Sequence, residues 1–156
     1  MNLSSSGLGR TRESGVPIVL RLLPHVHHPP ARVAVPWGGE DARALDARGY
    51  RVTVFAEAAP AVPGIAASAA AFLDAPDGEY DLVCETGGFS DLGPDHRAGY
   101  AAAAARALRP GGILFGTFPA DDTGALLTLF GARFDAVRLE PSAFGGARLE
   151  AVFVRR

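Results

Sequence analysis

The stretch that decides the fold is ARVAVPWGGEDARALDARGYRVTVF, residues 31–55. Two short valine-rich runs, 31–36 and 51–56, stand on either side of a segment with helical composition. A glycine pair precedes this segment and Gly49 follows it, as expected at the two ends of a helix. A strand, a helix and a second strand in this order form a βαβ unit, whose crossover requires the two strands to be parallel. The sequence therefore predicts a parallel α/β sheet.

The same alternation continues toward the C-terminus. The run 80–85 predicts a buried strand, 95–108 a helix and 112–118 another buried strand. The last part of the chain differs, because the strand-like runs 134–141 and 149–156 are joined directly by a turn-rich loop. Two strands joined in this way pair antiparallel. We therefore predict a Rossmann-like, doubly wound, mostly parallel sheet that ends in an antiparallel hairpin.

The remaining segments are less regular. Residues 1–15 are polar and have no periodic apolar pattern, which predicts a flexible tail followed by one domain over 16–156. Apolar positions at helical spacing predict a short helix over 18–24, covering one edge of the sheet. The alanines of 65–71 favour a helix in a stretch that is otherwise ambiguous.

Composition excludes several classes of protein. Fifteen basic and seventeen acidic side chains give a net charge of −2, which offers no basic face to nucleic acid. The single cysteine, Cys84, cannot form an internal disulfide. No apolar run approaches the roughly 20 residues of a membrane helix, and the N-terminus lacks the apolar core of a secretory signal. The expectation is a cytoplasmic protein without nucleic acid or membrane partners.

The turn at residues 35–41, VPWGGED, indicates a ligand site, because ligands of open α/β sheets bind beyond the carboxyl ends of the strands. It lacks the G-x-G-x-x-G spacing of dinucleotide sites, and Glu40 and Asp41 at the helix start would repel a phosphate. S-adenosylmethionine (SAM) has no phosphate and carries a cationic sulfonium, so this turn favours SAM over NAD. The same turn is also compatible with a purely structural role, packing the helix on the sheet.

The segments 29–39, 47–55 and 80–119 together resemble the thiopurine S-methyltransferase-like branch of class I SAM-dependent methyltransferases. The specific block is the last, which contains a strand ending in an acid, a loop with Leu92 and Pro94, a helix with Arg97 and Tyr100, and LRPGG before the next strand. The resemblance implies the methyltransferase fold, reduced in its third-strand region between 62 and 72. It also implies SAM as cofactor and a small-molecule substrate with sulfur or another soft nucleophile as acceptor.

The resemblance implies a cofactor site at the carboxyl ends of the strands. The implied residues are Pro36, Trp37, Gly38, Gly39, Glu57, Phe72, Leu73 and Glu85. Glu85 would face the sulfonium side of the crevice, although a strand-terminal acid is also common without any such role. No catalytic residue is assigned, since a thiolate acceptor needs no base. Asp91 and His96 either contact substrate or serve as ordinary capping and solvated side chains.

The chain departs from the family's pattern at three positions. Trp37 stands where the family has a glycine, in a turn two residues shorter, and its indole could fill the methionine pocket. The acid that binds the ribose falls on Ala56, with Glu57 one residue later, and the acid near the adenine falls on Ala71. These departures support a rival hypothesis, a methyltransferase-fold remnant that binds a partner or ligand without catalysis. A SAM-using enzyme that does not transfer methyl groups is a third possibility.

Three further expectations concern groups outside this site. His25, His27 and His28 lie beside prolines without acid or cysteine partners, so a solvated loop is favoured over a metal site. Cys84 is expected to be a small core residue.

Finally, a reduced third-strand region would expose one edge of the sheet, and an exposed edge favours pairing with a second copy. The sequence therefore predicts a homodimer through that edge.

Overall fold

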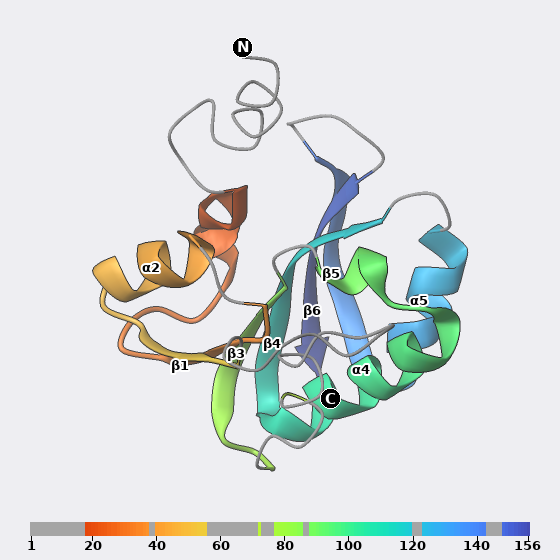
Figure 1. The fold of residues 1–156 in the computed structure, drawn as a ribbon, viewed down its shortest axis with the longest axis horizontal. Coiled ribbons are helices and arrows are strands. Elements are labelled where there is room, and N and C mark those ends of the chain that lie inside the picture. The colour runs from red at the N-terminus through yellow and green to blue at the C-terminus, as the bar shows by residue number, and fades with distance from the viewer. Residues whose placement is uncertain are drawn as a thin grey trace.

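The computed structural model describes residues 18–37, 40–55, 72, 77–85, 88–119, 123–142 and 148–156. These residues form one sheet of six strands (Figure 1). The strands are β1 (Arg32–Val35), β2 (Arg51–Val54), β3 (Tyr80–Glu85), β4 (Leu108–Pro119), β5 (Phe134–Pro141) and β6 (Arg148–Arg155). Their order across the sheet is β2-β1-β3-β4-β6-β5.

The pairing of the strands confirms the predicted fold class. Strand β1 pairs in parallel with both β2 and β3, and β3 pairs in parallel with β4. Strand β6 is antiparallel to both β4 and β5 and lies between them. The chain thus runs outward from β1 to β2 and returns to β3 on the other side of β1. The point where the strand order reverses lies between β1 and β3, and this is where open α/β sheets bind ligands.

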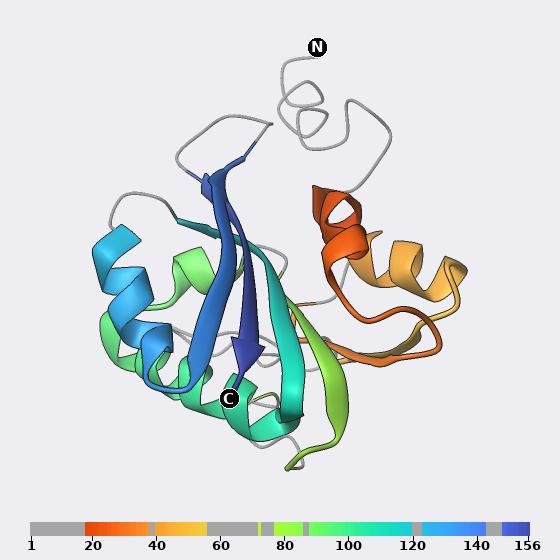
Figure 2. The same ribbon diagram turned by 180° about the vertical axis from the view of Figure 1, so that it is seen from behind.

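Helical segments cover both faces of the sheet (Figures 1 and 2). The 3₁₀ helix η1 (Ile18–His25) and the α-helix α2 (Glu40–Ala47) lie on one face. The helices α4 (Pro94–Ala107) and α5 (Thr123–Gly131) lie on the other. A short 3₁₀ helix, η2 (Gly88–Asp91), connects the end of β3 to α4.

Burial on both faces explains why the central strands are continuous apolar runs instead of alternating ones. On β3, Leu82 and Cys84 pack into the cluster under η1 and α2, whereas Val83 packs into the cluster under α4 and α5. Neighbouring β4 divides in the same way, with Phe115 on the first face and Leu114 on the second. The core therefore consists of two apolar layers separated by the sheet.

The position predicted for the first helix is wrong. Helix η1 lies on β4 and β6, near the middle of the sheet, and not over an edge. Its Leu22 and the following Val26 are buried in the same cluster as Phe115 of β4 and Val152 of β6. Apolar spacing shows which side of a helix is buried, but not which strand it will cover.

Element boundaries differ from the prediction by a few residues. Strands β1 and β2 are shorter than 31–36 and 51–56, while β4 begins four residues before the predicted 112, because Leu108 already pairs with Tyr80 ahead of an irregularity in the ladder. The predicted tail and the predicted helix over 65–71 lie outside the described residues. Within the described part of the chain, no helix is both long and apolar enough to span a membrane.

Candidate functional site

The candidate site lies at the carboxyl ends of β1 and β3, on either side of the strand-order reversal. Strand β1 leads directly into the buried Pro36 and the half-buried Trp37. Strand β3 ends at Glu85, which is 0% exposed. These three residues were predicted site residues, and the parallel pairing of β1 and β3 brings them together.

Among the described residues, three neutral groups donate hydrogen bonds to Glu85. Its Oε1 accepts one bond from the indole Nε1–H of Trp37 at 2.8 Å and another from the hydroxyl of Tyr100 at 2.7 Å. Its Oε2 accepts a bond from the backbone N–H of Phe89 at 2.8 Å. These donors bind both oxygens of the buried carboxylate, whose negative charge lies at this end of the sheet.

The indole of Trp37 lies against Gly88 at the start of η2. A Cβ atom at Gly88 would stand 2.2 Å from Cδ2 of the indole, a distance that no side chain could tolerate. The indole is also stacked on Tyr100, with ring centroids 6.3 Å apart and an interplanar angle of 19°. Trp37 therefore spans the crevice from the end of β1 to the segment after β3.

Close approach of β3 and β4 fixes the backbone of Glu85. Gly116 of β4 pairs with Glu85 and has a φ of +147°, in the region that favours glycine. A Cβ atom at Gly116 would lie 2.0 Å from the carbonyl oxygen of Glu85. Glycine at this position is thus needed to seat the acid where its three donors converge.

Burial and the neighbouring carboxylate keep two adjacent groups in their neutral forms. The pKa of Tyr100 is raised well above its ordinary value by burial, by the charge of Glu85 and by the hydrogen bond to Glu85. The pKa of the Cys84 thiol is raised well above its ordinary value by burial and by the charges of Asp41 and Glu85. Tyr100 is therefore a stable hydrogen-bond donor, and Cys84 is an unreactive core residue, as expected.

The other predicted site residues divide into two groups. Phe72 is 0% exposed, and its ring centroid lies 5.4 Å from that of Tyr100 and 5.5 Å from that of Phe55. The remaining four predicted residues lie outside the described part of the chain: Gly38, Gly39, Glu57 and Leu73. Tyr100 therefore contacts the rings of both Trp37 and Phe72, the first stacked and the second tilted at 42°.

Two contributors to the site were missed by sequence reasoning. Tyr100 was recognised only as part of a family pattern, yet it is one of the donors to Glu85. Gly88 carried a signal, since a glycine pair follows Glu85 after one intervening residue, but Gly88 contacts Trp37 from about a third of the chain away. His27 belongs to the fold instead of a site, because Nε2 lies 3.1 Å from the carbonyl oxygen of Gly111.

No protein-family model matches the chain, and no curated protein sequence matches it. Solved structures do match. The 1,6-didemethyltoxoflavin-N1-methyltransferase of Burkholderia thailandensis, crystallised with its substrate and S-adenosylhomocysteine, superposes with a TM-score of 0.72 at 19% identity, covering 96% of this chain and 86% of that one. A TehB-like SAM-dependent methyltransferase of Corynebacterium glutamicum superposes with a TM-score of 0.69 at 17% identity, covering 98% and 97%.

A third match comes from the complex between the Haloferax volcanii Trm112 methyltransferase activator and a putative methyltransferase. It has a TM-score of 0.65 at 14% identity and covers 94% of this chain and 93% of that one. At identities of 19% or less, these likenesses establish the fold alone. The fold is that of the class I SAM-dependent methyltransferases, as the sequence resemblance implied. The thiopurine methyltransferase-like branch remains a prediction.

Proposed function

We propose that this protein is a SAM-dependent methyltransferase that acts on a small molecule with sulfur or another soft nucleophile as acceptor. The observation that carries the proposal is the buried Glu85 carboxylate at the strand-order reversal, where Trp37, Tyr100 and Phe89 donate hydrogen bonds to it. A negative charge at this place disfavours phosphate-bearing nucleotides and attracts a cationic ligand. The fold, shared with methyltransferases of known structure, supports the same ligand.

The carboxylate of Glu85 suits the cationic sulfonium of SAM in charge, and the proposal requires the indole of Trp37 to leave Gly88 when SAM binds. In this proposal Pro36, Trp37 and Glu85 hold the ligand together with the predicted Gly38 and Gly39. SAM supplies an electrophilic methyl group, which passes directly to the acceptor. The protein aligns the two molecules and excludes water, and the indole is a suitable cover for an apolar methyl-transfer site. Glu57, Phe72 and Leu73 complete the set of proposed cofactor residues.

A separate pocket provides room for an acceptor. It has a volume of about 340 Å³ and lies between η2, the start of α4, α5 and the end of β4. Phe89, Leu126 and Leu129 make it largely apolar, and its volume falls within the range of small-molecule sites, about 300–1,000 Å³. Phe89 connects the pocket to the candidate site, because its N–H donates to Glu85. The proposed substrate is therefore a small, partly apolar molecule.

The experiment uses Trp37, the only tryptophan in the sequence, as an internal probe. SAM and S-adenosylhomocysteine are titrated separately into the protein, with tryptophan emission and calorimetric heat recorded together. We expect a saturable change in emission, because the indole must leave its contact with Gly88 and Tyr100. NAD serves as a control ligand and is expected to give no saturable signal. Neither heat nor an emission change at millimolar SAM would remove the methyltransferase proposal.

A second candidate function is favoured by one observation. Trp37 already spans the crevice and donates to Glu85, which is the arrangement expected of a methyltransferase-fold protein that acts as a binding or partner module without catalysis. The variant Trp37→Gly distinguishes the two functions. If the indole of the parent protein binds the ligand, Trp37→Gly will bind SAM more weakly than the parent does. If the indole only fills the crevice, Trp37→Gly will bind SAM and the parent protein will not.

We further propose a homodimer through the outer edge of β2. Within the described residues no strand pairs with that edge, and Arg51, Thr53 and Val54 are exposed along it. Sedimentation at micromolar concentration tests the proposal, with Val54→Lys expected to dissociate the dimer. Leu127→Lys on α5 is a matched control, since Leu127 is 39% exposed and Val54 40%. A parent protein that sediments as a monomer would contradict the proposal.

A further inference from the structure

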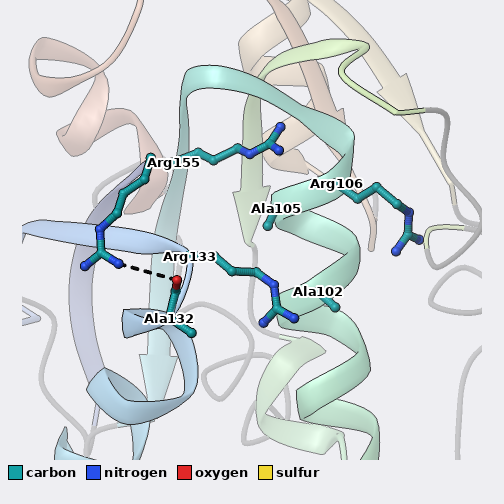
Figure 3. A pocket seen from close by; sticks show the side chains of 7 residues that line it. Ala102, Ala105, Arg106, Ala132, Arg133 and Arg155 are labelled. Carbon is teal, nitrogen blue, oxygen red and sulfur yellow. Dashed lines mark hydrogen bonds between the residues drawn. The ribbon is translucent and has the colours of Figure 1, made fainter.

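Another pocket, lined by arginines and alanines, lies at the opposite end of the sheet from the Glu85 site (Figure 3). It has a volume of about 450 Å³ and is formed by the C-terminal half of α4, the turn between α5 and β5, and the end of β6. Because β6 is antiparallel to β4, its last residues lie where β4 begins, far along the sheet from the strand-order reversal. The pocket is thus separate from the proposed methyl-transfer site.

Four arginines line this pocket together with three alanines. Arg106 comes from α4, Arg133 from the α5–β5 turn, and Arg155 and Arg156 from the end of β6 and the residue after it. Figure 3 shows Arg133 and Arg155 extending from these segments toward α4, where Ala102 and Ala105 line the pocket beside Arg106, whose guanidinium points to the other side of the helix. Four arginines thus line one cavity of a protein whose net charge is −2.

Acidic partners neutralise only part of this charge. Arg106 pairs with Asp77 at 3.4 Å, and Arg156 pairs with Asp135 at 2.8 Å. Both carboxylates are largely exposed, at 79% and 61%, so these pairs contribute little to stability. Among the residues that the structure describes, acids pair with two of the four arginines, Arg106 and Arg156, and positive charge remains at the pocket on Arg133 and Arg155.

The other two arginines are suited to bind an anion. Arg155 is fixed by a hydrogen bond that its Nη1–H donates to the carbonyl oxygen of Leu108. The other N–H groups of its guanidinium take no part in this bond. The guanidinium of Arg133 makes no hydrogen bond or ion pair with any residue that the structure describes. Guanidinium groups present paired N–H donors whose spacing matches two oxygens of a phosphate.

We infer that this pocket binds the phosphate group of a small ligand, such as a phosphate ester or a diphosphate. The volume falls within the range of small-molecule sites, about 300–1,000 Å³. Asp77 and Asp135 flank the arginines, so the positive charge is confined to one cavity. Nucleic acid would instead require a continuous basic stripe along the surface.

Calorimetric titration of the full chain with inorganic pyrophosphate tests this inference, in the absence of SAM. We expect saturable binding that weakens about tenfold or more in Arg133→Ala, since a hydrogen bond to a charged group contributes about 1.5–3 kcal/mol. Arg133→Lys keeps the charge but not the paired donors and is expected to fall between the two. Arg43→Ala is the matched control, because Arg43 is an exposed arginine of α2 on the other face of the sheet.

Three outcomes would overturn the inference. The absence of saturable pyrophosphate binding at millimolar concentration would show that the pocket takes no phosphate. Equal weakening in Arg43→Ala and Arg133→Ala would show a response to net charge alone. Tighter binding of a single-stranded RNA oligonucleotide than of pyrophosphate, lost in Arg133→Ala, would assign the arginines to nucleic acid. None of these outcomes depends on whether the protein binds SAM, so this inference and the proposed function fail separately.

Discussion

A single carboxylate organises the site at the scale of residues. Glu85 connects β1 through Trp37, α4 through Tyr100 and η2 through Phe89, so three segments distant in sequence are held by one side chain. Removing one donor leaves the charge buried and less well solvated, which costs more than an average hydrogen bond. The network is therefore a sensitive point for both stability and ligand binding.

Tyr100→Phe tests this network. Loss of the hydroxyl removes a 2.7 Å bond to a buried carboxylate, and we expect the free energy of unfolding to fall by about 1.5–3 kcal/mol. Urea denaturation followed by circular dichroism measures the change. Tyr50→Phe is the control, since the Tyr50 hydroxyl donates to the neutral carbonyl of His27 at 3.0 Å. A loss as small in Tyr100→Phe as in the control would mean that Glu85 depends little on Tyr100.

Gly116 is the second residue at which we expect a substitution to lower stability strongly. In Gly116→Ala the new methyl group would meet the carbonyl oxygen of Glu85, and φ of +147° is unfavourable for alanine. We expect a loss of at least about 2 kcal/mol, which corresponds to a melting temperature lower by about 4–8 °C. Differential scanning calorimetry measures the shift. Gly131→Ala is the control, because a Cβ atom at Gly131 would meet no atom within 4 Å. An unchanged melting temperature in Gly116→Ala would show that β3 and β4 can separate at low cost.

At the scale of elements, the contact between the β1 turn and η2 depends on the indole lying on Gly88. Gly88→Ala is expected to displace Trp37, shift its emission to longer wavelength and lower stability by about 1–3 kcal/mol. Gly93→Ala in the loop before α4 is the control, since a Cβ atom there would meet nothing within 4 Å. Parent-like emission from Gly88→Ala would show that the indole does not rest on this glycine.

The elements themselves were largely predictable from the sequence, and their contacts were not. Apolar runs and bounding glycines predicted β1, β2 and β3, and the runs are most continuous in β1 and β3, which are buried on both faces, whereas β2 is largely exposed. The place of η1 was predicted wrongly, since apolar spacing does not identify the strand that a helix covers. Site residues at strand ends, Trp37 and Glu85, followed from topology. Their hydrogen bond, the stacking on Tyr100 and the arginine pocket arise from tertiary packing that no local pattern reports.

At the scale of the whole molecule, two buried groups that stay protonated in the folded state, the Cys84 thiol and the Tyr100 hydroxyl, predict a loss of stability in alkaline solution. The folded state keeps the Cys84 thiol protonated above its ordinary pKa of 9.0, whereas the unfolded chain releases that proton. Unfolding therefore becomes more favourable as pH rises above 9.0, by up to about 1.4 kcal/mol per pH unit for this group. Tyr100 adds the same dependence above 10.0.

Urea denaturation between neutral and alkaline pH measures this dependence. Cys84→Ala is expected to lower stability at every pH, because it removes buried volume, but to reduce the slope above pH 9.0. Comparing slopes separates the titration from the packing loss. A slope identical to that of the parent would mean that another group controls alkaline unfolding.

The position of β6 has a consequence for how the protein is made. Strand β6 follows β5 in the chain but lies between β4 and β5 in the sheet. While the polypeptide is still emerging from the ribosome, β5 has no neighbour to pair with, and the apolar edge of β4 stays uncovered until β6 is released. The antiparallel half of the sheet must then assemble in one late step, during which a chaperone that shields β4 would be of most use.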